Sequence, residues 1–398
     1  MREGWSYKKL GDCFPYIKNG ANIKQIKDAE GLPITRIETL SNGLFNRDKM
    51  GYANIMEIGK YSEYILEDQD LLMSHINSKT YIGRTVEYKK EGDEVIIHGM
   101  NLLKLKADKS VIIPRFFFYY SFSYKFKFDV SCVRKDAVNQ SSMAIGDLKR
   151  FSLPIPPLTT QQQIVSELDL LSHILDQKRQ QLKEYDALAE SIFYDMFGDP
   201  VENPKGWEVK KLGELSHLKN GLNFEKLDSG NLIKILGVSD FQNNRTVTPK
   251  GLTSIYLKIP VEEYLLKDND LVFVRSNGSK SLIGRCVIME TDNEDIVFSG
   301  FCIRCRLTSN SIHPQFVSFV MQTKSVRDQI TNAGQGCNIS NVNQKILGSF
   351  LMIVPPLSLQ RSFASKIESI EHQKQLLRAS IKETEMLFQS RMDYWFNS

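Results

Sequence analysis

The stretch that decides the fold runs from Thr159 to Phe197 and reads TTQQQIVSELDLLSHILDQKRQQLKEYDALAESIFYDMF. Apolar residues recur in it at steps of four and three, which is the heptad pattern of a helix that packs along one stripe. Neither Gly nor Pro lies between Pro157 and Gly198, and Thr160 with Gln163 predicts a capping box at the start. At about 1.5 Å per residue the helix spans about 55 Å, so its long apolar stripe needs a cover.

A second heptad helix follows another proline pair, Pro355-Pro356, and also contains neither Gly nor Pro. The first helix delivers the chain to a second domain, and only by running back can the second helix cover it, so we expect an antiparallel pair. Polar residues take three seam positions, Lys178, Lys374 and Thr384. Two unrelated surface helices, each packed on its own domain, are the alternative. The predicted interface comprises Ile164, Leu168, Leu171, Leu175 and Leu182 on the first helix, and Phe363, Ile367, Ile370, Leu377 and Ile381 on the second.

The chain is also a tandem repeat with a period of about half its length. Gly4-Trp5 recurs as Gly206-Trp207, Ile82-Gly83-Arg84 as Ile283-Gly284-Arg285, and Pro156-Pro157-Leu158 as Pro355-Pro356-Leu357. Strand-like runs and a short helix in each copy predict a mixed α/β domain. The expected organisation is domain one at 1–155, a long helix at 156–198, a linker at 199–205, domain two at 206–354 and a second long helix at 355–398. The predicted fold is therefore α+β: two tandem domains and an antiparallel pair of long coiled-coil helices, with approximate two-fold symmetry.

Length and composition suit an ordinary soluble protein with two full cores. The chain has 398 residues, of which 41% are hydrophobic and 25% charged, and its net charge of +4 permits a nucleic-acid partner without indicating one. No apolar leader opens the sequence and no run is apolar enough to span a bilayer, so we expect a cytoplasmic protein without a membrane partner. The one CxxC, Cys302 to Cys305, lies in a strand-like run that points the two thiols to opposite faces, which argues against a metal site.

Two similar domains held apart by a stiff rod suit a partner with two places to read, and duplex DNA is the commonest partner of that kind. Residues 22–65 and 223–265 align poorly although the framework around them is kept. We therefore expect the two domains to read two different half-sites. A helix-pair scaffold that bridges two proteins without touching DNA is the rival hypothesis.

The doubled Trp-x-x-x-Lys-Leu-Gly opening, the Pro-Pro-Leu-x-x-Gln entries at Pro156–Gln161 and Pro355–Gln360, and the half-length repeat together resemble the specificity subunit of type I restriction-modification enzymes. The resemblance covers essentially the whole chain. It implies a non-catalytic subunit with two target recognition domains, which binds double-stranded DNA, docks two modification subunits on its helix pair and works with restriction subunits. Those partners would bring S-adenosylmethionine, ATP and Mg; no cofactor and no metal is expected in this chain.

Catalytic motifs are missing from the sequence. The Pro-Pro pairs stand in Ile-Pro-Pro-Leu and Val-Pro-Pro-Leu rather than in the Asn-Pro-Pro-aromatic loop of adenine methyltransferases. Gly278-Ser279-Lys280-Ser281 lacks the spacing of a phosphate-binding loop, and the six histidines form no zinc-binding pair. The chain is therefore not expected to be an enzyme, and no catalytic residue is predicted.

Two polar loops in each copy supply the candidate DNA contacts. One follows a buried strand and the other precedes the framework helix, and their Asn, Gln, Ser, Lys and Arg side chains suit base edges and phosphates. Solvated turns are the alternative for the loops, and a structural ion pair is the alternative for the equivalent Arg84 and Arg285. The candidates are Arg36, Ser74, His75, Asn77, Lys79, Arg84, Asn139, Gln140 and Ser141 in the first copy, and Lys234, Arg275, Ser276, Asn277, Ser279, Lys280, Arg285, Gln335, Asn338, Ser340 and Asn341 in the second.

Overall fold

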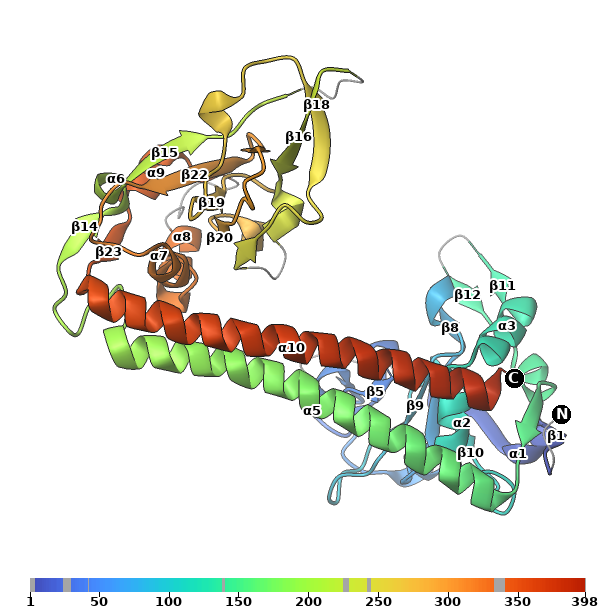
Figure 1. Cartoon of the computed structure of the whole chain (residues 1–398). Coiled ribbons are helices and arrows are strands. Elements are labelled where there is room, and N and C mark those ends of the chain that lie inside the picture. The colour runs from blue at the N-terminus through green and yellow to red at the C-terminus, as the bar shows by residue number, and fades with distance from the viewer. Residues whose placement is uncertain are drawn as a thin grey trace. The chain divides into compact units, whose positions relative to one another are not determined.

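The computed structural model describes residues 4–23, 30–41, 43–137, 140–224, 229–241, 245–332 and 341–397 (Figure 1). The chain divides into two compact units, Met1–Arg179 with Ala379–Ser398, and Gln180–Arg378. Each unit therefore holds one globular domain, half of the first long helix and half of the second. We refer to them as the first and second unit.

The first unit is built on an antiparallel sheet with the strand order β2-β10-β7-β9. One face of this sheet packs on α2, whose aromatic residues Phe116 and Phe117 are buried with Ile164 and Leu168 of α5 and Phe396 of α10. The elements are β1 (Ser6–Lys9), α1 (Leu10–Cys13), β2 (Tyr16–Asn19), β3 (Pro33–Ile34), β4 (Leu40–Ser41), β5 (Leu44–Phe45), β6 (Gly51–Tyr52), β7 (Leu71–Ser74), β8 (Ile76–Asn77), β9 (Thr85–Glu87), β10 (Leu102–Lys106), α2 (Pro114–Tyr120), α3 (Tyr124–Val133), β11 (Lys135–Asp136), β12 (Ser141–Ser142), α4 (Ile145–Lys149) and β13 (Ser152–Ile155).

The second unit repeats this framework with the sheet order β15-β22-β19-β20-β17, in which β17 pairs parallel to β20. A separate three-stranded sheet, β18-β16-β21, stands where the first unit has the short β3-β6 and β4-β5 pairs. The elements are β14 (Val209–Lys211), α6 (Leu212–Leu215), β15 (Ser216–Asn220), β16 (Asn231–Leu236), β17 (Thr246–Val247), β18 (Thr253–Leu257), β19 (Leu271–Val274), β20 (Cys286–Met289), β21 (Ile296–Phe298), β22 (Cys302–Leu307), α7 (Pro314–Val320), α8 (Lys324–Asn332), α9 (Gln344–Ser349) and β23 (Leu351–Ile353).

The predicted tandem repeat is confirmed element by element. The terminal pair β1-β13 matches β14-β23, the core strands β2, β10, β7 and β9 match β15, β22, β19 and β20, and both long helices, α5 (Leu158–Phe197) and α10 (Leu357–Phe396), have 40 residues. The copies differ in strand content over 22–65 and 223–265, the two segments that align poorly in sequence. The framework is therefore shared and these segments are particular to each copy.

The two long helices pair antiparallel within each unit. In the first unit Glu167 of α5 bonds Arg391 of α10; farther along α5, the Lys178 Nζ lies 2.8 Å from Thr384 Oγ1 of α10. In the second unit the Lys374 Nζ lies 2.7 Å from Asp186 Oδ1. Because the α10 number falls as the α5 number rises, the helices run in opposite directions, which excludes the alternative of two unrelated surface helices. Of the predicted interface, Ile164, Leu168, Leu175, Phe363, Ile367 and Ile370 are buried, whereas Leu171, Leu182, Leu377 and Ile381 are half-buried.

The start of each long helix is fixed by a buried glutamine instead of a capping box. The α5 helix begins at Leu158, so Thr160 lies inside its first turn and the capping box predicted there is wrong. The fully buried Gln161 accepts a hydrogen bond from the Ile113 N–H at 2.8 Å and donates to two main-chain carbonyls. Gln360 makes the corresponding three bonds at the start of α10. The repeated Pro-Pro-Leu-x-x-Gln motif is thus the joint between each domain and its helix.

Candidate nucleic-acid interface

In the first copy a small sheet brings the two predicted polar loops together. Strand β8 pairs with β12 so that Asn77 stands opposite Ser141, and the Met143 N–H donates to the His75 carbonyl at 2.9 Å. Strand β11 completes this three-stranded sheet, which lies beside α3 (Figure 1). Residues that are distant in sequence thereby form one polar surface.

The side chains of this surface divide into exposed and buried groups. Lys79 and Gln140 are exposed and Asn77 is half-buried, whereas Ser74, His75 and Ser141 are buried. Burial lowers the pKa of His75 to about 4, so this imidazole is neutral near pH 7. Asn77 donates from Nδ2 to Ser74 Oγ at 3.2 Å. The three buried residues therefore support the loop, and the side chains of Asn77, Lys79 and Gln140 are the ones accessible to a partner.

The basic residues of the first copy differ in their neighbours. The half-buried Arg84 stacks its guanidinium over the Tyr81 ring at 4.2 Å and makes no ion pair with the described residues. A structural ion pair, the alternative for Arg84, is thus absent among the described residues. Arg36 places its Nε 3.6 Å from Glu38 Oε2, which partly compensates its charge. Arg84 is the stronger candidate for a phosphate contact.

Asp136 on β11 is the centre of the hydrogen bonding in the first loop pair. It accepts from Arg134 Nε at 2.6 Å and Ser141 Oγ at 2.8 Å, and the Lys79 Nζ lies 3.3 Å from its Oδ2. The hydrogen bond from Arg134, followed by that from Ser141, holds the pKa of this carboxyl far below its usual range. One carboxylate thus ties the loop after β7 to the strand before α4. The sequence reasoning did not identify it.

The second copy also joins its two loops, through a shorter contact. Ser276 and Asn341 form an isolated antiparallel bridge, and the Val342 N–H donates to the Arg275 carbonyl at 2.8 Å. Arg275, Ser276 and Asn277 are half-buried, while Ser279 and Asn341 are exposed. The predicted candidates Asn139, Gln335, Asn338 and Ser340, and the side chain of Lys280, lie outside the described residues.

The other predicted residues of the second copy have unequal electrostatic neighbours. The Lys234 Nζ lies 2.6 Å from Glu294 Oε2, so its charge is compensated. Arg285, half-buried, makes no ion pair with the described residues, like its counterpart Arg84. Arg275 donates from Nη1 to the Gly300 carbonyl at 3.4 Å. Arg285 is therefore the better phosphate candidate in this copy.

Helix α8 supports the second loop through a residue that the sequence reasoning missed. Arg327 donates from Nη1 to the Ile283 carbonyl at 2.7 Å and from Nη2 to the Ser281 carbonyl at 3.0 Å. Burial, and then the nearby charge of Arg285, lower the pKa of Arg327. Hydrogen bonds to main-chain carbonyls leave no pattern of residue types, so no sequence signal pointed to these two contacts.

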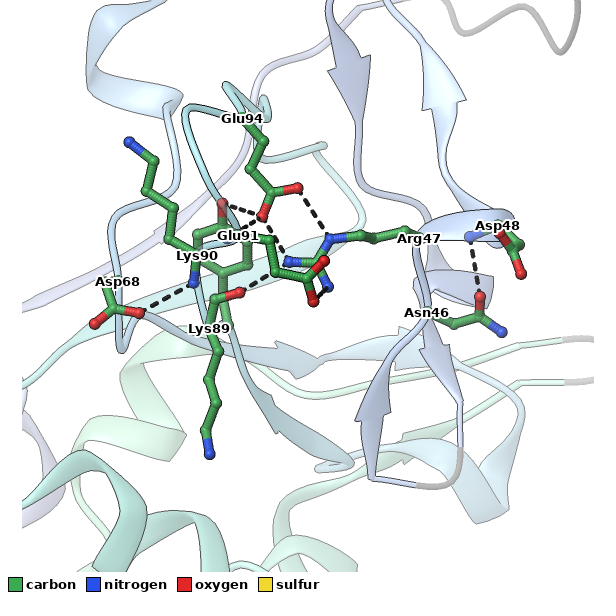
Figure 2. A network of polar contacts seen from close by, with 9 residues as sticks. Asn46, Arg47, Asp48, Asp68, Lys89, Lys90, Glu91 and Glu94 are labelled. Carbon is green, nitrogen blue, oxygen red and sulfur yellow. Dashed lines mark hydrogen bonds and ion pairs between the residues drawn. The ribbon is translucent and has the colours of Figure 1, made fainter. Parts of the chain in front are cut away.

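The copy-specific segment of the first unit is anchored by an arginine network (Figure 2). Arg47 opens the 3-10 turn η2 (Arg47–Lys49) and donates to Glu94 from Nε at 2.9 Å and from Nη2 at 2.6 Å. The same guanidinium reaches the Lys89 carbonyl at 2.8 Å and Glu91 Oε1 at 2.9 Å. The hydrogen bonds from Arg47 contribute most to lowering the pKa of Glu94 to about 2. The segment before β6 is thus fixed to the loop after β9.

The described residues offer no site for a metal. No group of three or more His, Cys, Asp or Glu side chains among them is placed to hold an ion. Cys302 and Cys305 belong to different hydrophobic clusters, and burial raises the pKa of each thiol to about 12. No helix in the described part of the chain is long and apolar enough to cross a membrane.

These features define a class of protein in which two copies of one mixed α/β framework are each joined to a pair of long antiparallel helices, and the comparisons with known proteins identify the family. The model of the type I restriction modification DNA specificity domain matches residues 2–184 and 204–386. The chain belongs to this family and carries two copies of its domain.

Relatives of the same kind match along nearly the whole chain. A Methanocaldococcus jannaschii protein, assigned as the MjaX specificity subunit of a type I restriction enzyme, is 28% identical over 97% of this chain and 90% of its own length. The type I restriction-modification S subunit from M. genitalium is similar in fold, with a TM-score of 0.55 at 13% identity over 98% of this chain and 95% of its own. A second solved chain, described in connection with complex assembly and conformational transition of the type I R-M system, has a TM-score of 0.58 at 14% identity. The match covers 100% of this chain and 98% of that chain. The predicted specificity-subunit function and fold are thereby confirmed.

Proposed function

We propose that each domain reads one half of a bipartite, asymmetric DNA site, and that the helix pair sets the gap between the halves. In this proposal residues 1–155 and 206–354 are the target recognition domains, 156–198 and 355–398 are the spacer helices, and 199–205 is the linker. The observation that carries the proposal is that one framework, in two copies, joins two polar loops of different composition beside an arginine that has no carboxylate partner among the described residues. Two copies of one framework that carry loops of different composition are suited to two different half-sites.

The contacts are divided by their exposure. In the first copy we assign Asn77, Lys79, Arg84 and Gln140 to the DNA surface, with Ser74, His75 and Ser141 beneath it. In the second copy Arg275, Ser276, Asn277, Ser279, Arg285 and Asn341 take this role. Arg36 and Lys234, whose charges are partly compensated, are secondary contacts.

The chain supplies sequence recognition, and its partners supply the chemistry. We propose that two modification subunits dock on the helix pair and bring S-adenosylmethionine, and that restriction subunits add ATP-dependent cleavage. One of the proteins of similar fold was described in connection with complex assembly of the type I system, which agrees with a multi-subunit complex. This role places the protein in the cytoplasm, where DNA is available.

Methylome sequencing tests the proposal directly. A host without other modification systems would express this chain with its cognate modification subunit, beside a control that lacks this chain. We expect a new adenine-methylation motif with two unlike halves and a fixed gap. If an assembled complex that binds S-adenosylmethionine produced no new motif, the proposal would be wrong.

Salt-dependent binding separates this function from the scaffold hypothesis. Phosphate contacts release counterions, so DNA affinity falls steeply as salt rises, whereas a protein scaffold has no such dependence on duplex DNA. Retention of the assembled complex on duplex DNA, measured at several salt concentrations, therefore decides between them.

A further inference from the structure

The second reading loop, which we define as residues 275–285, is fixed to helix α8 by the guanidinium of Arg327. Arg327 of α8 reaches the Ser281 and Ile283 carbonyls at 3.0 and 2.7 Å, on either side of the last residue of the 3-10 turn η7 (Lys280–Leu282). The donors of a guanidinium lie in a fixed planar fork, so bonding two carbonyls at once fixes the path of the main chain between them. A lysine ammonium has no such fork.

The loop also packs tightly against α8 at Gly284. Gly284 has a φ of +71°, and a Cβ added to it would stand 2.9 Å from Ile330 Cγ2. Positive φ and close contact both require glycine here. The helix therefore determines where the loop runs, and Arg285 follows directly from this fixed point.

The first reading loop, residues 74–84, is held by a different device. Gly83 packs on Val130 of α3 in the same way, but the position that corresponds to Arg327 is Lys127, whose exposed side chain makes no hydrogen bond or ion pair with the described residues. The first reading loop is fixed instead by Asp136, which binds Lys79 of the loop and Ser141 of β12. A cation thus fixes one loop and a carboxylate fixes the other.

We infer that Arg327 and Asp136 are positioning residues that set the specificity of the two readers independently, Arg327 for the second half-site and Asp136 for the first. This inference rests on the proposed function. Neither residue needs to touch DNA, because each acts by holding the loop that does. The two half-sites then have separate structural controls, one in each unit.

The test uses the assembled methyltransferase complex and three duplexes: the cognate site, a site with a mutated first half and a site with a mutated second half. Arg327→Lys keeps the charge but loses the fork, and Asp136→Asn keeps the shape but loses the charge. We expect Arg327→Lys to reduce discrimination at the second half-site by about tenfold and to spare the first, with the converse for Asp136→Asn. Lys324→Gln, an exposed change on the same helix, is the control and should alter neither ratio.

The salt dependence shows whether Arg327 positions the loop or binds phosphate itself. A lost phosphate contact lowers the slope of log K against log salt by about 0.9, whereas a positioning residue leaves it unchanged. We therefore expect the slope of Arg327→Leu to equal that of the wild type while its second-half discrimination falls. A reduced slope would overturn the positioning role, and so would equal loss at both halves.

Failure of the inference is distinguishable from failure of the proposed function. A wild-type complex that binds all three duplexes equally contradicts the proposed function itself. A wild type that discriminates, with an Arg327→Lys variant that keeps its second-half ratio within about twofold, contradicts only the inference. Retained first-half discrimination in the same variant shows that the protein is folded.

Discussion

Lys178 and Thr384 meet across the helix pair, with the lysine Nζ 2.8 Å from the threonine Oγ1 and 2.8 Å from Ser380 Oγ. Both positions are polar interruptions of an apolar heptad seam. A polar residue at such a position stabilises one register over others, because any slip leaves its donors among apolar neighbours. Lys178 and Thr384, which interrupt the apolar pattern of their own helices, thus contact each other across the helix pair.

Removing the two hydroxyl acceptors of Lys178 should destabilise the helix pair. Ser380→Ala combined with Thr384→Val leaves the ammonium without its hydroxyl partners, and we expect a loss of about 1–2 kcal/mol. Adding Lys178→Leu to this double variant should restore the stability, since an apolar residue suits the emptied seam. Thermal unfolding of the three proteins checks this. A triple variant less stable than the double would contradict the pairing.

Gln161 gives a second prediction, at the joint between domain and helix. Gln161→Leu leaves one main-chain N–H and two carbonyls buried without their partner, so the expected cost is on the order of 3 kcal/mol. Its neighbour Gln163 is exposed, and Gln163→Leu is the matched control with little expected effect. Calorimetry compares the two variants. Equal melting temperatures would show that the motif's glutamine is not a structural joint.

Much of this architecture could be predicted from the sequence because its signals are local or repeated. Heptads without Gly or Pro specify the helices α5 and α10, and the doubled motifs specify two copies. The pairing of β8 with β12 could not be predicted, because each strand has two residues and no periodicity. Ser74 and His75 are predicted DNA contacts that the structure buries, because short polar residues in a turn look alike in sequence whether they face solvent or support the loop from below.

Acidification should destabilise the first unit through His98. This imidazole is fully buried and bonds the Leu102 carbonyl through Nε2, and burial followed by the charge of Lys104 lowers its pKa from 6.5 to about 3. The unfolded chain therefore binds the proton more readily. The stability that His98 contributes is complete above pH 6.5 and is lost as the pH falls toward 3.

A variant isolates this contribution from other titrating groups. Burial raises the pKa of Asp70 to about 6, so its contribution runs the opposite way, present below pH 3.8 and lost as the pH rises through 6. His98→Gln keeps a donor for Leu102 and removes the titration. Thermal unfolding of wild type and variant between pH 7.5 and 4 should show a shallower fall in the variant. Parallel curves would exclude His98 as the cause.

Arg84 and Arg285 should act on affinity rather than on base preference. Both lack a carboxylate partner among the described residues, and both directly follow a glycine that packs on a helix, so they are suited to phosphates at equivalent places in the two copies. Replacing either by Gln should weaken binding about equally for cognate and mutated duplexes and lower the salt slope by about 0.9, and the double variant by about twice that. Arg150→Gln, an exposed arginine paired with Asp147 at 3.4 Å, is the control. Unchanged slopes with altered base preference would instead assign these arginines to base edges, because a base contact changes discrimination without releasing a counterion from the backbone.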